Sequence, residues 1–149
     1  MARMIRALAA AWIVAALMTS FSWAQSGRVQ LALTGTLLLG QDFDGELSGI
    51  VGPAVRLDIE LGRRFMVSPE ALYTLGWKSL SPAATLNFKF GSAYAGVGPM
   101  IWHGRWLIKA HLGTVVDHML IEAVYARGAP DHPYGEGAAF VGLALGFVF

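Results

Sequence analysis

The final segment of the chain, residues 138–149, alternates large apolar side chains with small ones. Successive side chains of an extended strand point to opposite faces, so the large ones would share one side. That side would carry Val141, Leu143, Leu145, Phe147 and Phe149. The opposite side would carry Gly142, Ala144, Gly146 and Val148. The pattern predicts a strand with one fully apolar face, which must lie against an apolar environment.

Residues 1–24 have the composition of an export signal. Arg3 and Arg6 precede an uninterrupted apolar run over 7–18, and Ser22-Trp23-Ala24 offers small residues at the two positions that a signal peptidase reads. An uncleaved membrane helix is the alternative, but the run is shorter than the roughly 20 residues that a spanning helix needs. We therefore expect cleavage after Ala24, giving a signal peptide over 1–24 and one domain over 25–149.

The composition is that of a membrane protein, with 55% hydrophobic and 14% charged residues. Past Met18, however, no stretch is as long as a spanning helix. A bilayer accepts only helices and closed barrels, because backbone polar groups in hydrocarbon cannot pair with water. The chain is therefore predicted to be an all-β, closed transmembrane barrel.

Charge and cysteine content exclude several other classes. Without Arg3 and Arg6, nine Lys and Arg remain against ten Asp and Glu, and the basic residues are scattered, so no nucleic-acid partner is expected. The chain has no cysteine, which excludes disulfides, thiolate chemistry and a lipidated N-terminal cysteine. No cofactor is expected.

Turn-forming residues divide the chain after residue 24 into eight strand candidates of about the 9 to 11 residues that a tilted spanning strand needs. We place them at 28–39, 50–61, 65–76, 83–90, 93–102, 105–116, 119–127 and 138–149. Eight is an even number, as an antiparallel up-and-down barrel with both ends on one side requires. The fold prediction is thus an eight-stranded antiparallel barrel.

The two sides of these strands differ in charge. One side is apolar, while the other carries the eight ionisable residues Arg56, Asp58, Glu60, Glu70, Lys89, Lys109, His111 and Glu122. A soluble lipocalin-like barrel would turn its apolar side inward, and a membrane barrel would turn it outward. The charged side is also rich in Gly, Ala and Thr, which suits a crowded interior better than a surface in water. We therefore predict apolar side chains toward lipid and charges inside.

Connection lengths suggest an orientation. With the processed N-terminus in the periplasm, the links 40–49, 77–82, His103-Gly104 and 128–137 face outward. The links 62–64, Gly91-Ser92 and Asp117-His118 face the periplasm and are short, as in transmembrane barrels. Aromatic residues near strand ends are expected to form interfacial belts, namely Tyr73, Trp77, Trp102, Trp106, Tyr125 and Phe149.

Three motifs resemble the small eight-stranded outer-membrane barrels, the porin-like, OmpA/OmpX-type barrel domains. They are the segment 64–73 with Pro69-Glu70, the mid-chain Gly96-Val97-Gly98-Pro99, and the terminal Gly146-Phe147-Val148-Phe149. The resemblance covers the whole domain and implies a bacterial outer-membrane location. It also implies outer-membrane lipids as partners, and the barrel-assembly machinery as a partner through the C-terminal strand, with Phe149 as the assembly signal. The family includes adhesins, structural anchors and members of unknown role, so it does not imply one activity.

The eight ionisable residues have two interpretations. They could line a narrow path for small solutes, or they could pair with one another, with Asp58, Glu60, Glu70 and Glu122 opposite Arg56, Lys89, Lys109 and His111. An eight-stranded barrel is just wide enough inside for its own side chains, and buried charges require partners, so pairing is favoured. The predicted protein is non-enzymatic, with a packed polar interior and a structural or surface-interaction role.

Other functions find weaker support. A lipid A-modifying enzyme would need a serine and a histidine together, and His103 with Ser79 or Ser81 supplies only the residue types. A metal site is not indicated by His111, His118 and His132, and the acidic segment 41–46 is too short for a calcium loop. The outer loops could bind a partner through Phe43, Trp77, Trp102 or Tyr134.

Overall fold

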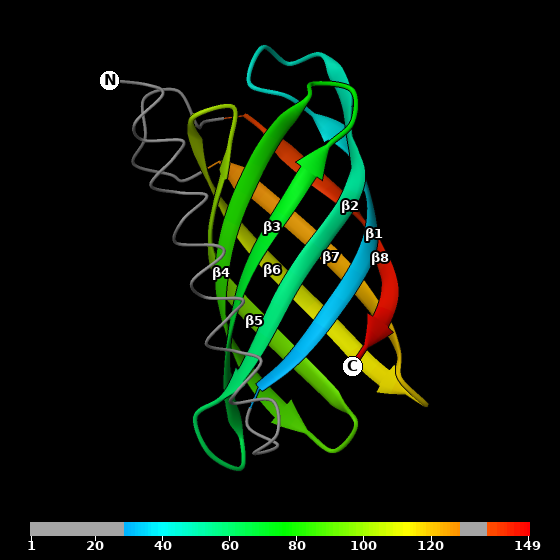
Figure 1. Ribbon diagram of the computed structural model, residues 1–149. Coiled ribbons are helices and arrows are strands. Elements are labelled where there is room, and N and C mark those ends of the chain that lie inside the picture. Colours follow the sequence, from blue (N-terminus) through cyan, green and yellow to red (C-terminus); the bar gives the residue numbers. More distant parts are fainter. Residues whose placement is uncertain (1–28, 129–136) are drawn as a thin grey trace, which may run out of the picture.

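The computed structural model describes residues 29–128 and 137–149, which form eight strands in one closed barrel (Figure 1). The strands are β1 (Val29–Gln41), β2 (Leu47–Glu60), β3 (Phe65–Thr74), β4 (Ser79–Phe90), β5 (Ala93–Trp102), β6 (Arg105–Val116), β7 (Met119–Gly128) and β8 (Ala139–Val148). Each strand pairs antiparallel with the next, and β8 pairs with β1. The predicted eight-stranded up-and-down barrel is confirmed. The predicted signal peptide lies outside the described residues.

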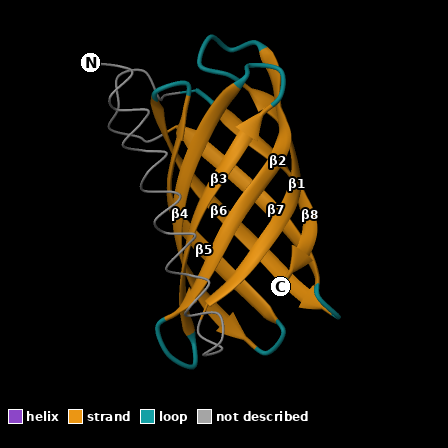
Figure 2. Ribbon diagram, viewed as in Figure 1, coloured by secondary structure: helices purple, strands orange, loops and turns teal. Residues whose placement is uncertain are grey.

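The connections gather at two ends of the barrel (Figure 2). One end, here called the turn end, carries residues 61–64, Gly91-Ser92 and Asp117-His118, together with the C-terminal Phe149. The other, here called the loop end, carries residues 42–46, 75–78 and His103-Gly104 and the connection from β7 to β8, of which 129–136 lie outside the described residues. In 29–128 and 137–149, no helix is both long and apolar enough to cross a bilayer.

Side chains alternate between the lumen and the outer wall as the sequence predicted. On β2, Val51 and Val55 are exposed on the wall, whereas Ala54, Arg56 and Asp58 are buried inside. The ambiguous strand β5 follows the same rule, with Val97 and Pro99 outside and Tyr94, Gly96 and Gly98 inside. The apolar rows therefore face outward.

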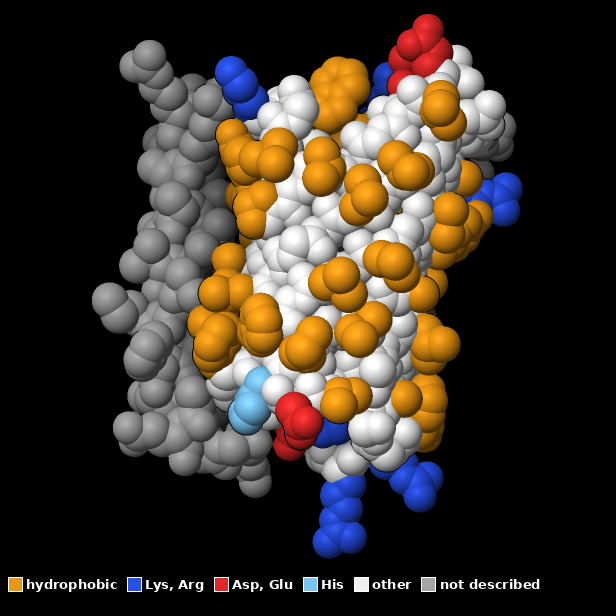
Figure 3. Space-filling view, turned by 90° about the vertical axis from the view of Figure 1, so that its right-hand side faces the viewer, with side chains coloured by type: hydrophobic (Ala, Val, Ile, Leu, Met, Phe, Trp, Pro, Cys, Tyr) orange, Lys and Arg blue, Asp and Glu red, His pale blue; other side chains and the backbone are white. Residues whose placement is uncertain are grey.

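The outer wall is apolar between its two ends (Figure 3). Within the described ranges, the exposed Asp, Glu, Lys and Arg residues lie in connections or at the second-last position of a strand, namely Asp44, Glu46, Arg63, Arg64, Lys78, Asp117 and Arg127. Exposed aromatic side chains form two girdles. Phe65, Phe88, Phe90, Phe147 and Phe149 lie toward the turn end, and Tyr73, Trp77, Trp106 and Tyr125 lie toward the loop end. Such a wall matches a hydrocarbon layer bounded by two interfaces.

Several strands are longer than predicted at the loop end. The β1–β2 ladder continues to the pair Gln41 and Leu47, and β4 begins at Ser79, although β3 ends at Thr74 and not at 76, so these two loops are shorter than expected. Pro82, predicted as the last residue of the link 77–82, lies within β4 opposite Ala71 and points outward. The strand ends were predicted from turn-forming residues, but some of these, such as Gly40 and Gly49, still pair through their backbone.

Prolines mark the places where the ladders are interrupted. The β2–β3 pairing skips between Arg56–Glu70 and Ile59–Val67, where Pro69 lies on β3. Proline has no backbone N–H, so a strand can hold it only where a ladder bond is missing. Pro99 lies at the similar gap between β4 and β5, next to Gly98, whose missing side chain lets the backbone of β4 approach closely.

The lumen has two unlike halves. Toward the loop end it holds an apolar core that includes Leu38, Ile50, Leu72, Met100, Trp102, Leu107, Val124 and Phe140. Toward the turn end it holds the charged residues. The prediction of a polar interior is therefore correct for only one half. Trp102, predicted for an interfacial belt, is only 2% exposed and points inward, because the alternation along β5 gives it the same side as Tyr94.

Candidate functional site

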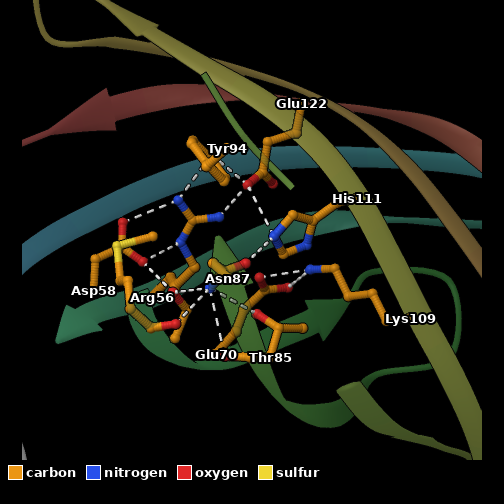
Figure 4. Close-up of polar contacts among 11 residues, drawn as sticks. Arg56, Asp58, Glu70, Thr85, Asn87, Tyr94, Lys109, His111 and Glu122 are labelled. Carbon is orange, nitrogen blue, oxygen red and sulfur yellow. Dashed lines mark hydrogen bonds and ion pairs between the residues drawn. The ribbon is translucent and has the colours of Figure 1, made fainter. Parts of the chain in front are cut away.

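Arg56 of β2 is the centre of a charge network inside the turn-end half (Figure 4). Its guanidinium lies between two carboxylates: Nε is 2.8 Å from Asp58 Oδ1, and Nη1 donates to Glu122 of β7. Nη2 donates to the Tyr94 hydroxyl at 3.1 Å, and Tyr94 in turn donates to Glu122 Oε1 at 2.5 Å. The side chains of Arg56 and Glu122 are both 1% exposed. One cation is thus held by two carboxylates. Its planar guanidinium donates charge-assisted hydrogen bonds to both of them.

A chain of hydrogen bonds extends from Asp58 across the lumen. Ser68 Oγ donates to Asp58 Oδ1 at 2.6 Å, and Asn87 Nδ2 donates to Ser68 Oγ at 2.7 Å. Asn87 Oδ1 then accepts from His111 Nε2 at 2.6 Å, and this ring nitrogen is 4.0 Å from Glu122 Oε1. The chain therefore ends near the carboxylate that binds Arg56, without a hydrogen bond to it. Its bonds satisfy buried polar groups that would otherwise be costly, whereas His111 Nδ1 has no hydrogen-bond partner among the described residues.

Two further ion pairs flank this network. Lys109 Nζ lies 2.8 and 2.7 Å from the two oxygens of Glu70, and both side chains are almost fully buried. Lys89 Nζ lies 2.5 Å from Glu60 Oε1 near the mouth of the turn end, where the two side chains are 32% and 29% exposed. All eight ionisable residues singled out in the sequence therefore lie in the lumen and face an opposite charge or, for His111, a carboxylate at 4.0 Å.

These contacts connect strands that do not pair with each other. Arg56 joins β2 to β5 and β7, Lys109 joins β6 to β3, and Lys89 joins β4 to β2. Neighbouring strands already share backbone hydrogen bonds, whereas these side chains bridge the lumen. The network therefore acts as a set of internal cross-ties and fills the space that a channel would need.

Sequence reasoning missed some members of the network. Tyr94 was placed inside but not among the ionic residues, although it contacts both Arg56 and Glu122. Its position opposite Gly113 is a signal that could have found it, because a side chain at Gly113 would overlap the Tyr94 ring and Glu122. Gly96 likewise leaves room for Asn87 and His111. Inward glycines thus mark the places where long polar side chains pack.

A second group of residues forms an aromatic cluster at the loop end. Phe43 stacks on Trp102 with ring centroids 5.7 Å apart, and Trp77 packs edge to face against His103 at 4.7 Å. Arg105 lies over the Phe43 ring at 4.5 Å. Together with Asp42 and Asp44, these residues line a pocket of about 190 Å³. Burial and the nearby charge of Arg105 lower the pKa of His103 below its usual 6.5.

The residues considered for hydrolase chemistry do not form a bonded pair. The hydroxyls of Ser79 and Ser81 are buried and have no hydrogen-bond partner among the described residues, so neither is bonded to His103. His103 instead packs between Trp77 and Trp102. A serine nucleophile needs a base within hydrogen-bond reach, although apo geometry is often loose.

The acidic β1–β2 loop is held by its own hydrogen bonds. Asp42 Oδ1 accepts from the backbone N–H groups of Asp44 and Glu46, both at 3.0 Å. His111 and His118 bond to Asn87 and to the Val148 carbonyl oxygen, and His132 lies outside the described residues. Within 29–128 and 137–149, no three His, Asp or Glu side chains group as metal ligands would.

Phe149, predicted as an assembly signal, lies on the outer wall at the turn end and is largely exposed. Its backbone exchanges hydrogen bonds with Leu31 of β1, at 2.8 and 3.2 Å. The residue therefore extends the seam between β8 and β1. Its role in assembly stays a prediction.

Comparison with known proteins gives one structural likeness. Neither a protein-family model nor a curated protein matches this chain. Among solved structures, it is similar to the crystal structure of Ail, the attachment invasion locus protein of Yersinia pestis, an eight-stranded outer-membrane β-barrel. The match has 14% sequence identity and a TM-score of 0.47, and it covers 81% of this chain and 97% of Ail. The likeness concerns the fold alone, and the strand order of this chain establishes its barrel independently.

Proposed function

We propose that this chain is an integral, non-enzymatic protein of a bacterial outer membrane, whose barrel is sealed and holds a recognition surface at the loop end. The observation that carries the proposal is the inversion of polarity: exposed apolar side chains cover the wall, while Arg56 and Glu122 are buried in the lumen. Such an arrangement is stable only where the surroundings of the barrel are apolar, as they are in a lipid bilayer.

The packing of the lumen supports a sealed barrel. A water-filled path would leave inward side chains accessible to solvent, yet Leu72, Met100 and Leu107 in one half and Arg56 and Asn87 in the other are at most 2% exposed. Each half of the lumen is filled, the loop-end half by apolar packing and the turn-end half by ion pairs together with a smaller apolar cluster that includes Met66, Leu120 and Val148. The narrow-channel alternative would have to displace one of these layers.

Two measurements on the same purified protein test this proposal. Folded barrels resist sodium dodecyl sulfate until they are heated, so unboiled protein should migrate differently from boiled protein and should float with lipid vesicles. In planar bilayers we expect no steady conductance of porin size. Failure to insert would contradict the membrane assignment, and stable open channels would contradict the sealed lumen.

The loop-end aromatic cluster favours recognition as the role of the exposed end. Trp77 is 53% exposed beside Asp44 and Arg105, so an apolar ring, an acid and a guanidinium are presented together. Exposed aromatic residues and arginines are the groups that most often dominate binding surfaces. Interfacial anchoring explains the aromatic residues of the loop-end girdle that lie outside this cluster. It does not explain Phe43, which belongs to the β1–β2 loop and is held over the lumen by Trp102.

A matched pair of variants separates recognition from anchoring. Vesicles that display the wild-type protein would be applied to arrays of immobilised saccharides and peptides, and compared with Trp77→Ala and with Trp106→Ala. Trp106 lies on the outer wall near the same end, outside the pocket. Loss of binding with Trp77→Ala alone supports recognition, whereas no wild-type binding on any array, or equal loss in both variants, contradicts it.

The non-enzymatic part of the proposal has its own test. Mass spectrometry of lipid A from cells with and without the protein should give the same acyl pattern. A pattern that changes, and that reverts with Ser79→Ala, Ser81→Ala or His103→Ala, would favour the lipid A-modifying alternative instead.

A further inference from the structure

A second pocket lies at the turn end, at the opposite end of the barrel from the aromatic cluster. It has a volume of about 590 Å³ and is lined by Arg63, Arg64, Phe88, Lys89, Phe90 and Gly91. Three of these residues are cationic, two are aromatic, and none is acidic. The residues come from the β2–β3 turn, from the end of β4 and from the β4–β5 turn.

The pocket carries a net positive charge. Arg63 and Arg64 are exposed, and neither side chain forms an ion pair with a residue of the described chain. Lys89 is paired with Glu60, so among the described residues two of the three lining cations have no ion-pair partner. The backbone holds the β2–β3 turn next to β4, since Lys89 N–H donates to the Arg64 carbonyl oxygen at 2.7 Å. An anion is the ligand that this charge favours.

The apolar part of the pocket continues onto the outer wall. Phe88 packs edge to face against Phe65 at 5.5 Å and stacks near Phe90 at 6.4 Å. All three rings are more than 40% exposed toward the surface that we assign to lipid. Cationic side chains next to exposed aromatic rings suit a molecule that has an anionic headgroup and an apolar tail.

We infer that this pocket binds an anionic phospholipid, with the headgroup phosphate at Arg63 and Arg64 and the acyl chains along Phe65, Phe88 and Phe90. Basic clusters at the edge of the hydrocarbon layer attract anionic headgroups, and guanidinium groups bind phosphate oxygens in a bidentate manner. The inference rests on the proposed membrane insertion, and in the proposed orientation the site faces the periplasmic leaflet. On this inference, the turn end recognises a lipid and not a protein partner.

The test uses native mass spectrometry of the full-length folded protein in detergent, with phosphatidylglycerol and phosphatidylcholine of identical chains as probes. We expect phosphatidylglycerol to bind more tightly. The double variant Arg63→Gln/Arg64→Gln should weaken it by roughly 10- to 30-fold. The control Lys78→Gln/Arg127→Gln removes the same charge from the loop end and should change affinity by less than about twofold. Equal binding of the two lipids, or equal loss in both double variants, overturns the inference.

A third variant tests the sign of the effect. Glu60→Gln removes the acid that neutralises Lys89 and should tighten phosphatidylglycerol binding, with little change for phosphatidylcholine. Weaker or unchanged phosphatidylglycerol binding would contradict the electrostatic argument even if the arginine variant behaves as expected.

Two further measurements complete the test. One identifies the source of the phosphate, and the other separates the proposed lipid site from the proposed membrane insertion. Glycerol 3-phosphate should bind far more weakly than the lipid, and equal binding would show a soluble-phosphate site instead of a lipid site. Vesicle flotation of the same preparation reports insertion. Protein that inserts but does not distinguish the lipids contradicts only the lipid site, whereas protein that does not insert contradicts both proposals.

Discussion

The two halves of the lumen are enclosed by the same eight strands but are filled by different kinds of side chain. The loop-end half is packed with side chains such as Leu38, Leu72 and Phe140. The turn-end half is held by Arg56 and Glu122 and the groups bonded to them. Apolar packing tolerates exchange of similar shapes, whereas a buried charge requires a specific partner. The comparison indicates that the turn-end half specifies the register across the lumen and that the loop-end half mainly excludes water.

The largest expected loss of stability comes from removing the central cation of the turn-end half. Arg56→Met leaves the Asp58 and Glu122 carboxylates buried without their main partner, so we expect the free energy of unfolding to fall by about 3–5 kcal/mol. Urea titration of the folded protein in micelles, followed by gel mobility, measures this change. Arg127→Met, on the exposed rim, should cost less than about 0.5 kcal/mol. A loss below 1 kcal/mol for Arg56→Met would contradict the role of the network.

A loss of stability is also expected in the loop-end half, where its cause is a cavity and not an unpaired charge. Leu72→Ala creates a cavity beside Met100 and Trp102 and should cost about 2–4 kcal/mol. The matched variant Leu86→Ala removes the same atoms from the lipid-facing wall, where detergent refills the space, and should cost much less. Equal losses would show that this half of the lumen is loosely packed.

The ion pair between Lys109 and Glu70 tests whether the charges themselves stabilise the barrel. Lys109→Met alone leaves a buried carboxylate and should cost about 2–3 kcal/mol, whereas Lys109→Met/Glu70→Leu restores a neutral, filled space and should recover most of that loss. Together with Glu70→Leu and the wild type, these variants form a double-mutant cycle in the same urea titration. A double variant no more stable than Lys109→Met would contradict the expected recovery and would show that the pair is a net source of stability.

The smallest effect is expected at the mouth. Lys89 and Glu60 are about one-third exposed, so Lys89→Gln should cost no more than about 1 kcal/mol. Salt screens exposed pairs more than buried ones, so this loss should shrink between low and high ionic strength, whereas that of Arg56→Met should not. Equal salt dependence of the two variants would contradict the difference in burial between mouth and centre.

The fold was predictable because lipid and lumen impose opposite preferences on alternate residues. The strand number, the outward rows and the inward position of all eight ionisable residues follow from that alternation. The pairing partners were not predictable in detail, since the contact of Lys109 with Glu70 depends on how far the strands are staggered around the barrel.

The apolar half of the lumen was missed for a related reason. Where both faces of a strand are apolar, as at Leu38 and Leu39, alternation assigns the sides but cannot show that one of them packs in a core. Trp102 was placed in an interfacial belt for the same reason, because a tryptophan near a strand end is common in both settings. Proline was also misleading at Pro82, since the outer side of a strand accepts it where β5 provides no partner.

The residues of the charge network come from β2 to β7, and among the described contacts neither β1 nor β8 contributes a charged member. In the middle of the seam between these two strands, the lumenal side chains are small, such as Thr34, Thr36 and Ala144, whereas Leu38 and Phe140 join the apolar core nearer the loop end. The first and last strands can therefore separate without breaking any of these ion pairs. A curved sheet of β2 to β7 can therefore hold its internal cross-ties before the cylinder closes, and closure adds the backbone pairing of β1 with β8 and the packing of Leu38 and Phe140, but no ion pair.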